Sequence, residues 1–114
     1  MERLKDTTAL ITGAARGLGA QIAQRFAESG AFVFVNDLNI DAANDIAKKI
    51  NGKALACDVA DSSAVRAMFN EIAGTDRSLN ILVNNAGINT GTTGGGKTLS
   101  LIHISEPTRR YAIS

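Results

Sequence analysis

The residues from Thr8 to Gly19, TALITGAARGLG, place a short apolar run directly before a cluster of glycines. The run 8–12 predicts a strand, and the glycines allow a tight turn into a helix. Gly13 permits the turn, Gly17 lets the backbone approach a bound group, and Gly19 lets the helix pack closely on the strand. A helix that begins here offers free backbone N–H groups, which favour phosphate. The stretch therefore predicts a strand, a phosphate-binding loop and a helix.

Three more segments have the composition of strands, at residues 32–37, 53–57 and 79–85. The first of these is a continuous apolar run, which is typical of a strand with both faces covered. Between the strands lie segments whose apolar residues are three and four apart, as in amphipathic helices. Four strands joined by helices through right-handed crossovers predict the order 3-2-1-4. The fold class is therefore α/β, the N-terminal half of a doubly wound parallel sheet of the Rossmann type.

The predicted helices each have one apolar face and recognisable ends. Gly30 is expected to end the first helix, and Asp61 or Ser62 is expected to cap the third. The residues expected to face the sheet are Leu18, Ile22, Ala23, Phe26 and Ala27 in the first helix, Ala43, Ile46, Ala47 and Ile50 in the second, and Val65, Met68, Phe69 and Ile72 in the third.

Asp37 lies at the carboxyl end of the second predicted strand, 18 residues after Gly19. In that place its carboxylate can accept hydrogen bonds from both ribose hydroxyls of an adenosine. A glycine cluster alone is weak evidence, because glycines also end strands for steric reasons, but the acid at this separation is a second feature. The carboxylate would repel a 2′-phosphate, so NAD is expected in preference to NADP. Arg16 in the glycine loop argues weakly for NADP, and we give Asp37 the greater weight.

Four motifs occur in order along the chain: TGAARGLG at 12–19, Asp37 after the second strand, CDVAD at 57–61, and NNAG at 84–87. Together they resemble the N-terminal half of the short-chain dehydrogenase/reductase family. The resemblance is to the branch that includes 3-oxoacyl-carrier-protein reductases and hydroxyacyl or sugar-alcohol dehydrogenases. It covers roughly residues 4 to 88, which we expect to form part of a dinucleotide-binding domain spanning 1–88.

The resemblance implies a set of cofactor-binding residues. These are Gly13, Arg16, Gly17, Leu18 and Gly19 around the pyrophosphate and adenosine ribose, with Asp37 on that ribose, Asp58 and Val59 at the adenine, and Asn85, Ala86 and Gly87 against the nicotinamide ribose. Some of these assignments have a simpler alternative. Asp58 and the pair 84–85 can be structural turn residues, and an exposed Arg16 can have no role.

No catalytic residue or metal site is predicted. The family donates a proton from a tyrosine, with a lysine four residues later and a preceding serine, but the only tyrosine here is Tyr111 and the sequence ends at Ser114. His103 and Cys57 lack the partners that catalysis would need. We therefore expect part of an oxidoreductase whose intact form transfers hydride between a nicotinamide cofactor and a hydroxyl or ketone substrate. The alternative is a noncatalytic dinucleotide-binding module.

The segment 91–98, GTTGGGKT, matches the phosphate-loop pattern G-x-x-x-x-G-K-[ST]. Its context is wrong for a triphosphatase, because residues 86–90 separate it from the preceding strand and no later strand supplies an acid for magnesium. Residues 99–109, LSLIHISEPTR, resemble the in-frame translation of a sequencing-adapter DNA. We therefore expect the true protein to be truncated here, and residues 89–114 to be an atypical tail that is not native.

Composition narrows the possible partners. The 12 basic and 11 acidic residues nearly balance, and the few aromatic residues offer no platform for nucleic acid. The amino-terminal residues contain no apolar run long enough for a membrane span or signal peptide. With one cysteine the chain forms no internal disulfide, so we expect a cytoplasmic protein. The resemblance implies a small-molecule substrate and a homo-oligomer for the intact protein.

Overall fold

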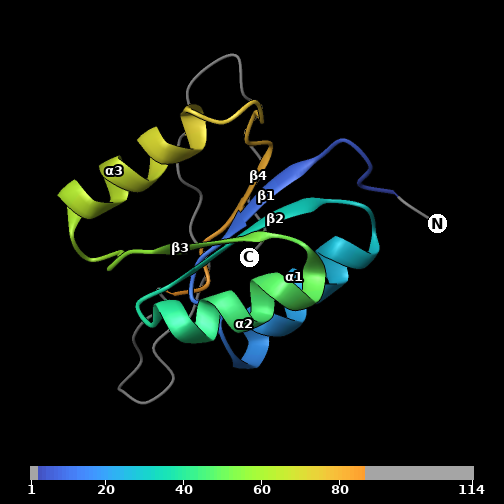
Figure 1. Ribbon diagram of the computed structural model, residues 1–114, viewed down its shortest axis with the longest axis horizontal. Coiled ribbons are helices and arrows are strands. Elements are labelled where there is room, and N and C mark those ends of the chain that lie inside the picture. Colours follow the sequence, from blue (N-terminus) through green and yellow to red (C-terminus); the bar gives the residue numbers. More distant parts are fainter. Residues whose placement is uncertain (1–2, 87–114) are drawn as a thin grey trace.

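The computed structural model describes residues 3–86 (Figure 1). Along the chain the elements are β1 (Thr8–Ile11), α1 (Gly17–Glu28), β2 (Phe32–Asp37), α2 (Ile40–Ile50), β3 (Lys53–Ala56), α3 (Ser62–Ala73) and β4 (Ile81–Val83). Some features singled out in the sequence lie outside the described residues. They are Gly87, the glycine-rich segment 91–98, the adapter-like segment 99–109 with His103, and Tyr111.

The four strands form one parallel sheet in the order β3-β2-β1-β4. β1 lies in the interior of the sheet, where Ala9 is opposite Val33 of β2 on one side and Ile81 of β4 on the other. All the strands point the same way, so their carboxyl ends meet at one edge. The predicted fold class and strand order are confirmed.

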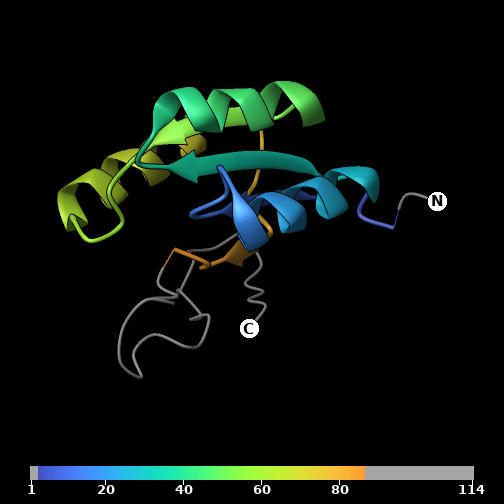
Figure 2. The ribbon, with the colours of Figure 1, turned by 90° about the horizontal axis from the view of Figure 1, so that it is seen from below.

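Helices cover both faces of the sheet. Figure 1 shows α3 on one face and α1 with α2 on the other. Figure 2 shows β2 running between α1 and α2, both of which it contacts. Small residues of these two helices, including Ala20, Ala23, Ala43 and Ala47, are buried against the sheet. Their size allows the helices to approach the strands closely.

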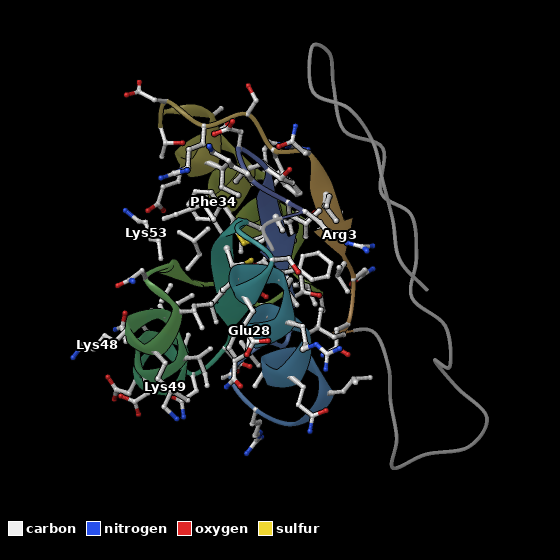
Figure 3. All side chains as sticks on the ribbon, turned by 90° about the vertical axis from the view of Figure 1, so that its right-hand side faces the viewer. Arg3, Glu28, Phe34, Lys48, Lys49 and Lys53 are labelled. Carbon is white, nitrogen blue, oxygen red and sulfur yellow. The ribbon has the colours of Figure 1, made fainter. Side chains whose placement is uncertain are left out.

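β2 contributes to two separate apolar cores because its side chains alternate between the faces. Val33 and Val35 pack in the core beneath α1 and α2, whereas Phe34 packs with Met68 and Ile72 of α3. Figure 3 shows Phe34 in the interior, while Lys48 and other lysines lie at the surface. The expectation that both faces of this strand are covered is confirmed.

The helix ends follow local chemistry. Gly30, with φ +100°, follows the C-cap of α1, and its N–H donates to the Ala27 carbonyl at 3.0 Å. The Asp61 carboxylate caps α3 by accepting hydrogen bonds from the N–H groups of Ser63 at 2.9 Å and Ala64 at 3.2 Å. Ser62 is the first helical residue, so the cap is Asp61.

Replacing Asp61 with alanine should lower the melting temperature by about 5 °C, because losing an N-cap acceptor costs about 1 kcal/mol. Ser62→Ala is the matched control, since Ser62 is also exposed but is not the cap residue. Thermal unfolding followed by circular dichroism compares the two variants. Equal melting temperatures for them would contradict the assignment of the cap.

The structure corrects two details of the predictions. Leu18 was expected on the buried face of the first helix, but it is 55% exposed, because Gly19 is the residue of that first turn that packs on the preceding loop. β1 and β3 each end one residue earlier than predicted, at Ile11 and Ala56, and the fourth strand is Ile81–Val83, shorter than predicted at both ends. It ends early because Asn85 turns back to donate its N–H to the Val83 carbonyl at 3.1 Å.

Candidate functional site

The loop after β1 forms the centre of the candidate site, at the carboxyl ends of the strands. Gly13 and Gly17 have φ values of +61° and +62°, in the left-handed region that favours glycine. Arg16 is the N-cap of α1 but makes no side-chain capping bond, and the first turn holds no acidic residue. The first N–H groups of α1 therefore keep their capacity to bind an anion.

Gly17 and Gly19 have different reasons to lack a side chain. A Cβ atom added to Gly17 would meet no atom within 4 Å, so the glycine leaves open space beside the helix start. A Cβ atom on Gly19 would collide with the Gly13 carbonyl oxygen and would lie 2.6 Å from Nδ2 of Asn85. Gly17 thus keeps a surface accessible, whereas Gly19 lets α1 pack on the loop.

Asp37 ends β2 with its carboxylate facing the glycine loop. Oδ2 accepts a hydrogen bond from the Ala15 N–H at 3.1 Å, and Oδ1 accepts one from the Asn39 N–H at 3.1 Å. The side chain is half-buried. The sequence-based expectation that this acid lies beside the Gly13 to Gly19 loop agrees with its position.

Residues after β4 brace the same loop. The Asn85 side chain donates from Nδ2 to the Gly13 carbonyl at 3.1 Å, and the Ala86 N–H donates to Oγ1 of Thr12 at 2.9 Å. The Thr12 hydroxyl also lies 3.2 Å from Oδ1 of Asn84, to which it can donate. These bonds tie the end of β1 to the end of β4, so the pair 84–85 has a structural role whatever else it does.

Asp58 and Val59 follow β3 at the same edge of the sheet. Asp58 is exposed, and its Oδ1 accepts from the Ala60 N–H at 2.9 Å in a local turn. Val59 lines a cleft of about 390 Å³ between α3 and the sheet, together with Thr12, Phe69 and Ala86. Much of the cleft wall is apolar, which suits a flat aromatic ring.

Cys57 belongs to the core on the α3 face of the sheet. Burial, and after it the carboxylates of Asp58 and Asp61, raises the pKa of the Cys57 thiol. The raised pKa disfavours the reactive thiolate, consistent with a packing role.

Within residues 3–86, no group of three or more His, Cys, Asp or Glu side chains is arranged to hold a metal ion. No helix in this part of the chain has the length and apolar character to cross a membrane.

The structure thus brings Gly13, Gly17, Gly19, Asp37 and Asn85 together around one loop. Arg16 and Leu18 are exposed at the start of α1, and Asp58, Val59 and Ala86 lie along the same edge of the sheet.

Sequence reasoning assigned no role to Thr12, Ala15 or Asn36, all of which bond within this region. Thr12 and Ala15 lay inside the glycine motif, which was the one available signal. Nothing in the sequence indicated a role for Asn36, because it lies within the apolar run 32–37.

The glycine loop, the start of α1 and Asp37 at the end of β2 form one corner of the site, and this corner fits the chemical groups of a dinucleotide. The space that a Cβ atom would fill at Gly17 and the N–H groups at the start of α1 suit a diphosphate. The Asp37 carboxylate suits the hydroxyls of a ribose.

Known proteins resemble this chain in sequence and in fold. A family model described as short chain dehydrogenase matches residues 7–104. D-threitol dehydrogenase of Mycolicibacterium smegmatis is 41% identical over 91 residues, which cover 75% of this chain and 35% of that protein. The chain spans about a third of the length of the curated relatives it matches.

Two solved structures show the same arrangement of elements. A short-chain type dehydrogenase/reductase from Mycobacterium marinum has a TM-score of 0.68 and 41% identity, over 75% of this chain and 35% of that one. A gluconate 5-dehydrogenase from Burkholderia cenocepacia, solved in complex with NADP and tartrate, has a TM-score of 0.70 and 38% identity, over 75% of this chain and 36% of that one. The fold, the glycine loop and these matches agree: the chain belongs to the short-chain dehydrogenase family.

Proposed function

We propose that this chain is the cofactor-binding part of an oxidoreductase, and that it binds NAD at the carboxyl ends of the strands of its sheet. The observation that carries the proposal is the position of Asp37, whose carboxylate faces the glycine loop at the start of α1. A phosphate-binding loop and a ribose-binding acid at one corner suit the two ends of an adenosine diphosphate group.

Each part of the corner has a role in this proposal. The N–H groups at the start of α1 bind the diphosphate, and Gly17 leaves room for it. Asp37 accepts hydrogen bonds from the adenosine ribose, while Val59 borders the adenine. Asn85 and Ala86 keep the end of β4 in place beside the nicotinamide ribose. When bound, the nicotinamide supplies the acceptor or donor of hydride.

We further propose that the whole protein transfers hydride between this cofactor and a small molecule that carries a hydroxyl or ketone group. The names of D-threitol dehydrogenase and gluconate 5-dehydrogenase indicate substrates of that kind for those relatives. Homo-oligomeric assembly and a cytoplasmic location complete the proposal. The buried, unpaired Cys57 is compatible with such a location.

NAD is proposed in preference to NADP on electrostatic grounds. A 2′-phosphate would lie close to the Asp37 carboxylate, and like charges at short distance repel. Arg16 is exposed at the start of α1 and is the basic residue of the loop sequence, but within residues 3–86 its side chain makes no capping hydrogen bond there. The similar gluconate 5-dehydrogenase was solved in complex with NADP.

NADH should bind at least about tenfold more tightly than NADPH, as expected for one uncompensated like-charge contact. Fluorescence titration of the two reduced cofactors measures the ratio. Comparing 5′-AMP with adenosine 2′,5′-bisphosphate isolates the effect of the 2′-phosphate. Tighter binding of NADPH would overturn the NAD preference, and binding of neither cofactor would overturn the proposed function.

A further inference from the structure

The glycine loop is held at three consecutive residues by three separate hydrogen bonds. The Gly13 carbonyl accepts from Nδ2 of Asn85 at 3.1 Å, and the Ala14 N–H donates to the Asn36 carbonyl at 2.9 Å. The Ala15 N–H donates to Oδ2 of Asp37 at 3.1 Å. The third bond has a charged acceptor, which makes it stronger than a bond between neutral groups.

The two oxygens of Asp37 have separate partners in the described residues. Oδ1 accepts from the Asn39 N–H, which fixes the side chain to the start of α2, and Oδ2 accepts from Ala15 in the loop. The carboxylate therefore connects the end of β2 to the loop before α1. Ala15 itself is buried, so its N–H has little access to water as a substitute acceptor.

We propose that Asp37 is a positioning residue for the diphosphate loop in addition to its role at the adenosine ribose. This inference rests on the proposed function. Without the carboxylate, Ala15 loses its acceptor and the loop occupies other conformations. The affinity for a diphosphate then falls in proportion to the fraction of molecules with the loop in its binding conformation.

Inorganic pyrophosphate separates the two roles because it contains no ribose. If Asp37 served only the ribose, its removal would leave pyrophosphate affinity unchanged, or increase it by removing a negative charge near an anion. If Asp37 positions the loop, its removal weakens pyrophosphate binding. The two possibilities predict different signs.

The experiment uses the full chain and three variants. Asp37→Ala removes both acceptors, and Asp37→Asn keeps one neutral oxygen that can accept from Ala15. Asp45→Ala is the control, since it removes the same charge from an exposed position on α2. Calorimetry measures pyrophosphate affinity, fluorescence measures NADH affinity, and amide hydrogen exchange reports on the Ala15 N–H without any ligand.

We expect Asp37→Ala to weaken pyrophosphate binding about tenfold and to speed exchange of the Ala15 amide by a similar factor. Asp37→Asn should restore most of the pyrophosphate affinity but not the NADH affinity, because the amide replaces one acceptor oxygen with an NH2 group, which cannot accept from a ribose hydroxyl, and it carries no charge. Asp45→Ala should match the unaltered chain in every measurement.

Three results would overturn the inference. One is pyrophosphate affinity that is unchanged or higher in Asp37→Ala while NADH affinity falls, which would leave the ribose role intact. Another is equal exchange of the Ala15 amide with and without the carboxylate. The third is an unaltered chain that binds neither NADH nor pyrophosphate, which would remove the proposed function and this inference with it.

Discussion

Replacing Gly19 with alanine should destabilise the fold by about 3 kcal/mol, even though alanine is the better helix former by about 1 kcal/mol. The added Cβ atom would collide with the Gly13 carbonyl oxygen and would lie 2.9 Å from Cα of Ala14. Both are backbone atoms of the loop, so neither can move aside by a side-chain rotation. Relief requires α1 to shift away from the loop, and because the Cβ atom would also lie 2.6 Å from Nδ2 of Asn85, it disturbs the bond from that atom to the Gly13 carbonyl. Urea unfolding measures the loss.

Gly17→Ala is the matched control because it adds the same methyl group two residues earlier, at the first residue of the same helix. Its Cβ atom meets no atom within 4 Å, so the cost is the backbone strain at φ +62°, about 1 kcal/mol. The methyl group would occupy the space proposed for the diphosphate. The free energy of NADH binding should therefore be reduced by more than the free energy of unfolding. Equal stability losses for the two variants would contradict the packing role of Gly19. Undiminished NADH binding by Gly17→Ala would remove the diphosphate from this corner.

The sequence allowed the sheet to be predicted almost completely because its signals are local. The apolar run 32–37 was predicted as a strand and is β2 with the same bounds. A run of this length without polar interruption is stable mainly when both faces are buried, as they are here. The position of Asp37 followed from the end of that strand. Parallel strands bring their carboxyl ends to one edge, which places the acid beside the glycine loop.

Most of the features that could not be predicted from the sequence depend on contacts between residues far apart in the chain. β4 ends at a local turn in which the Asn85 N–H donates to the Val83 carbonyl, and Asn85 and Ala86 then bond to Gly13 and Thr12, more than 70 positions away. The exposure of Leu18 depends on how α1 lies over that loop, since helical spacing alone put it on the buried face. Asn36 likewise stood in an apolar run, and its role is set by carbonyl groups that the neighbouring strand and its end supply.

Asn36→Asp should destabilise the protein by about 4 kcal/mol at neutral pH, although the side chain hardly changes in size. Asn36 is 1% exposed, and its Nδ2 donates to the carbonyl oxygens of Leu55 at 3.0 Å and Cys57 at 3.3 Å. An aspartate would direct a carboxylate oxygen at two carbonyl oxygens. It would be a buried charge without a donor, while the two carbonyls would lose their partner.

The pH dependence follows from the same contact. Because the charged form is disfavoured in the fold, the pKa of the introduced carboxyl should lie above its value of about 3.9 in the unfolded chain. Below the unfolded-state pKa, the carboxyl is protonated in both the folded and the unfolded chain. In the fold it can then donate a hydrogen bond to one of the two carbonyls. As pH rises toward the folded-state pKa, stability should fall by about 1.4 kcal/mol per pH unit relative to the unaltered protein.

Asn80→Asp provides the matched control for this change. Asn80 uses its oxygen, since Oδ1 accepts from the Thr8 N–H at 2.8 Å, and an aspartate keeps that acceptor. The control should therefore stay within about 0.5 kcal/mol of the unaltered protein at neutral pH. Urea unfolding of both variants between pH 4 and pH 8, a range of about four units around these pKa values, separates the two cases. If Asn36→Asp and Asn80→Asp lost equal stability, or if the loss for Asn36→Asp did not grow with pH, the amide at position 36 would not be the donor that joins β2 to β3 beside the site.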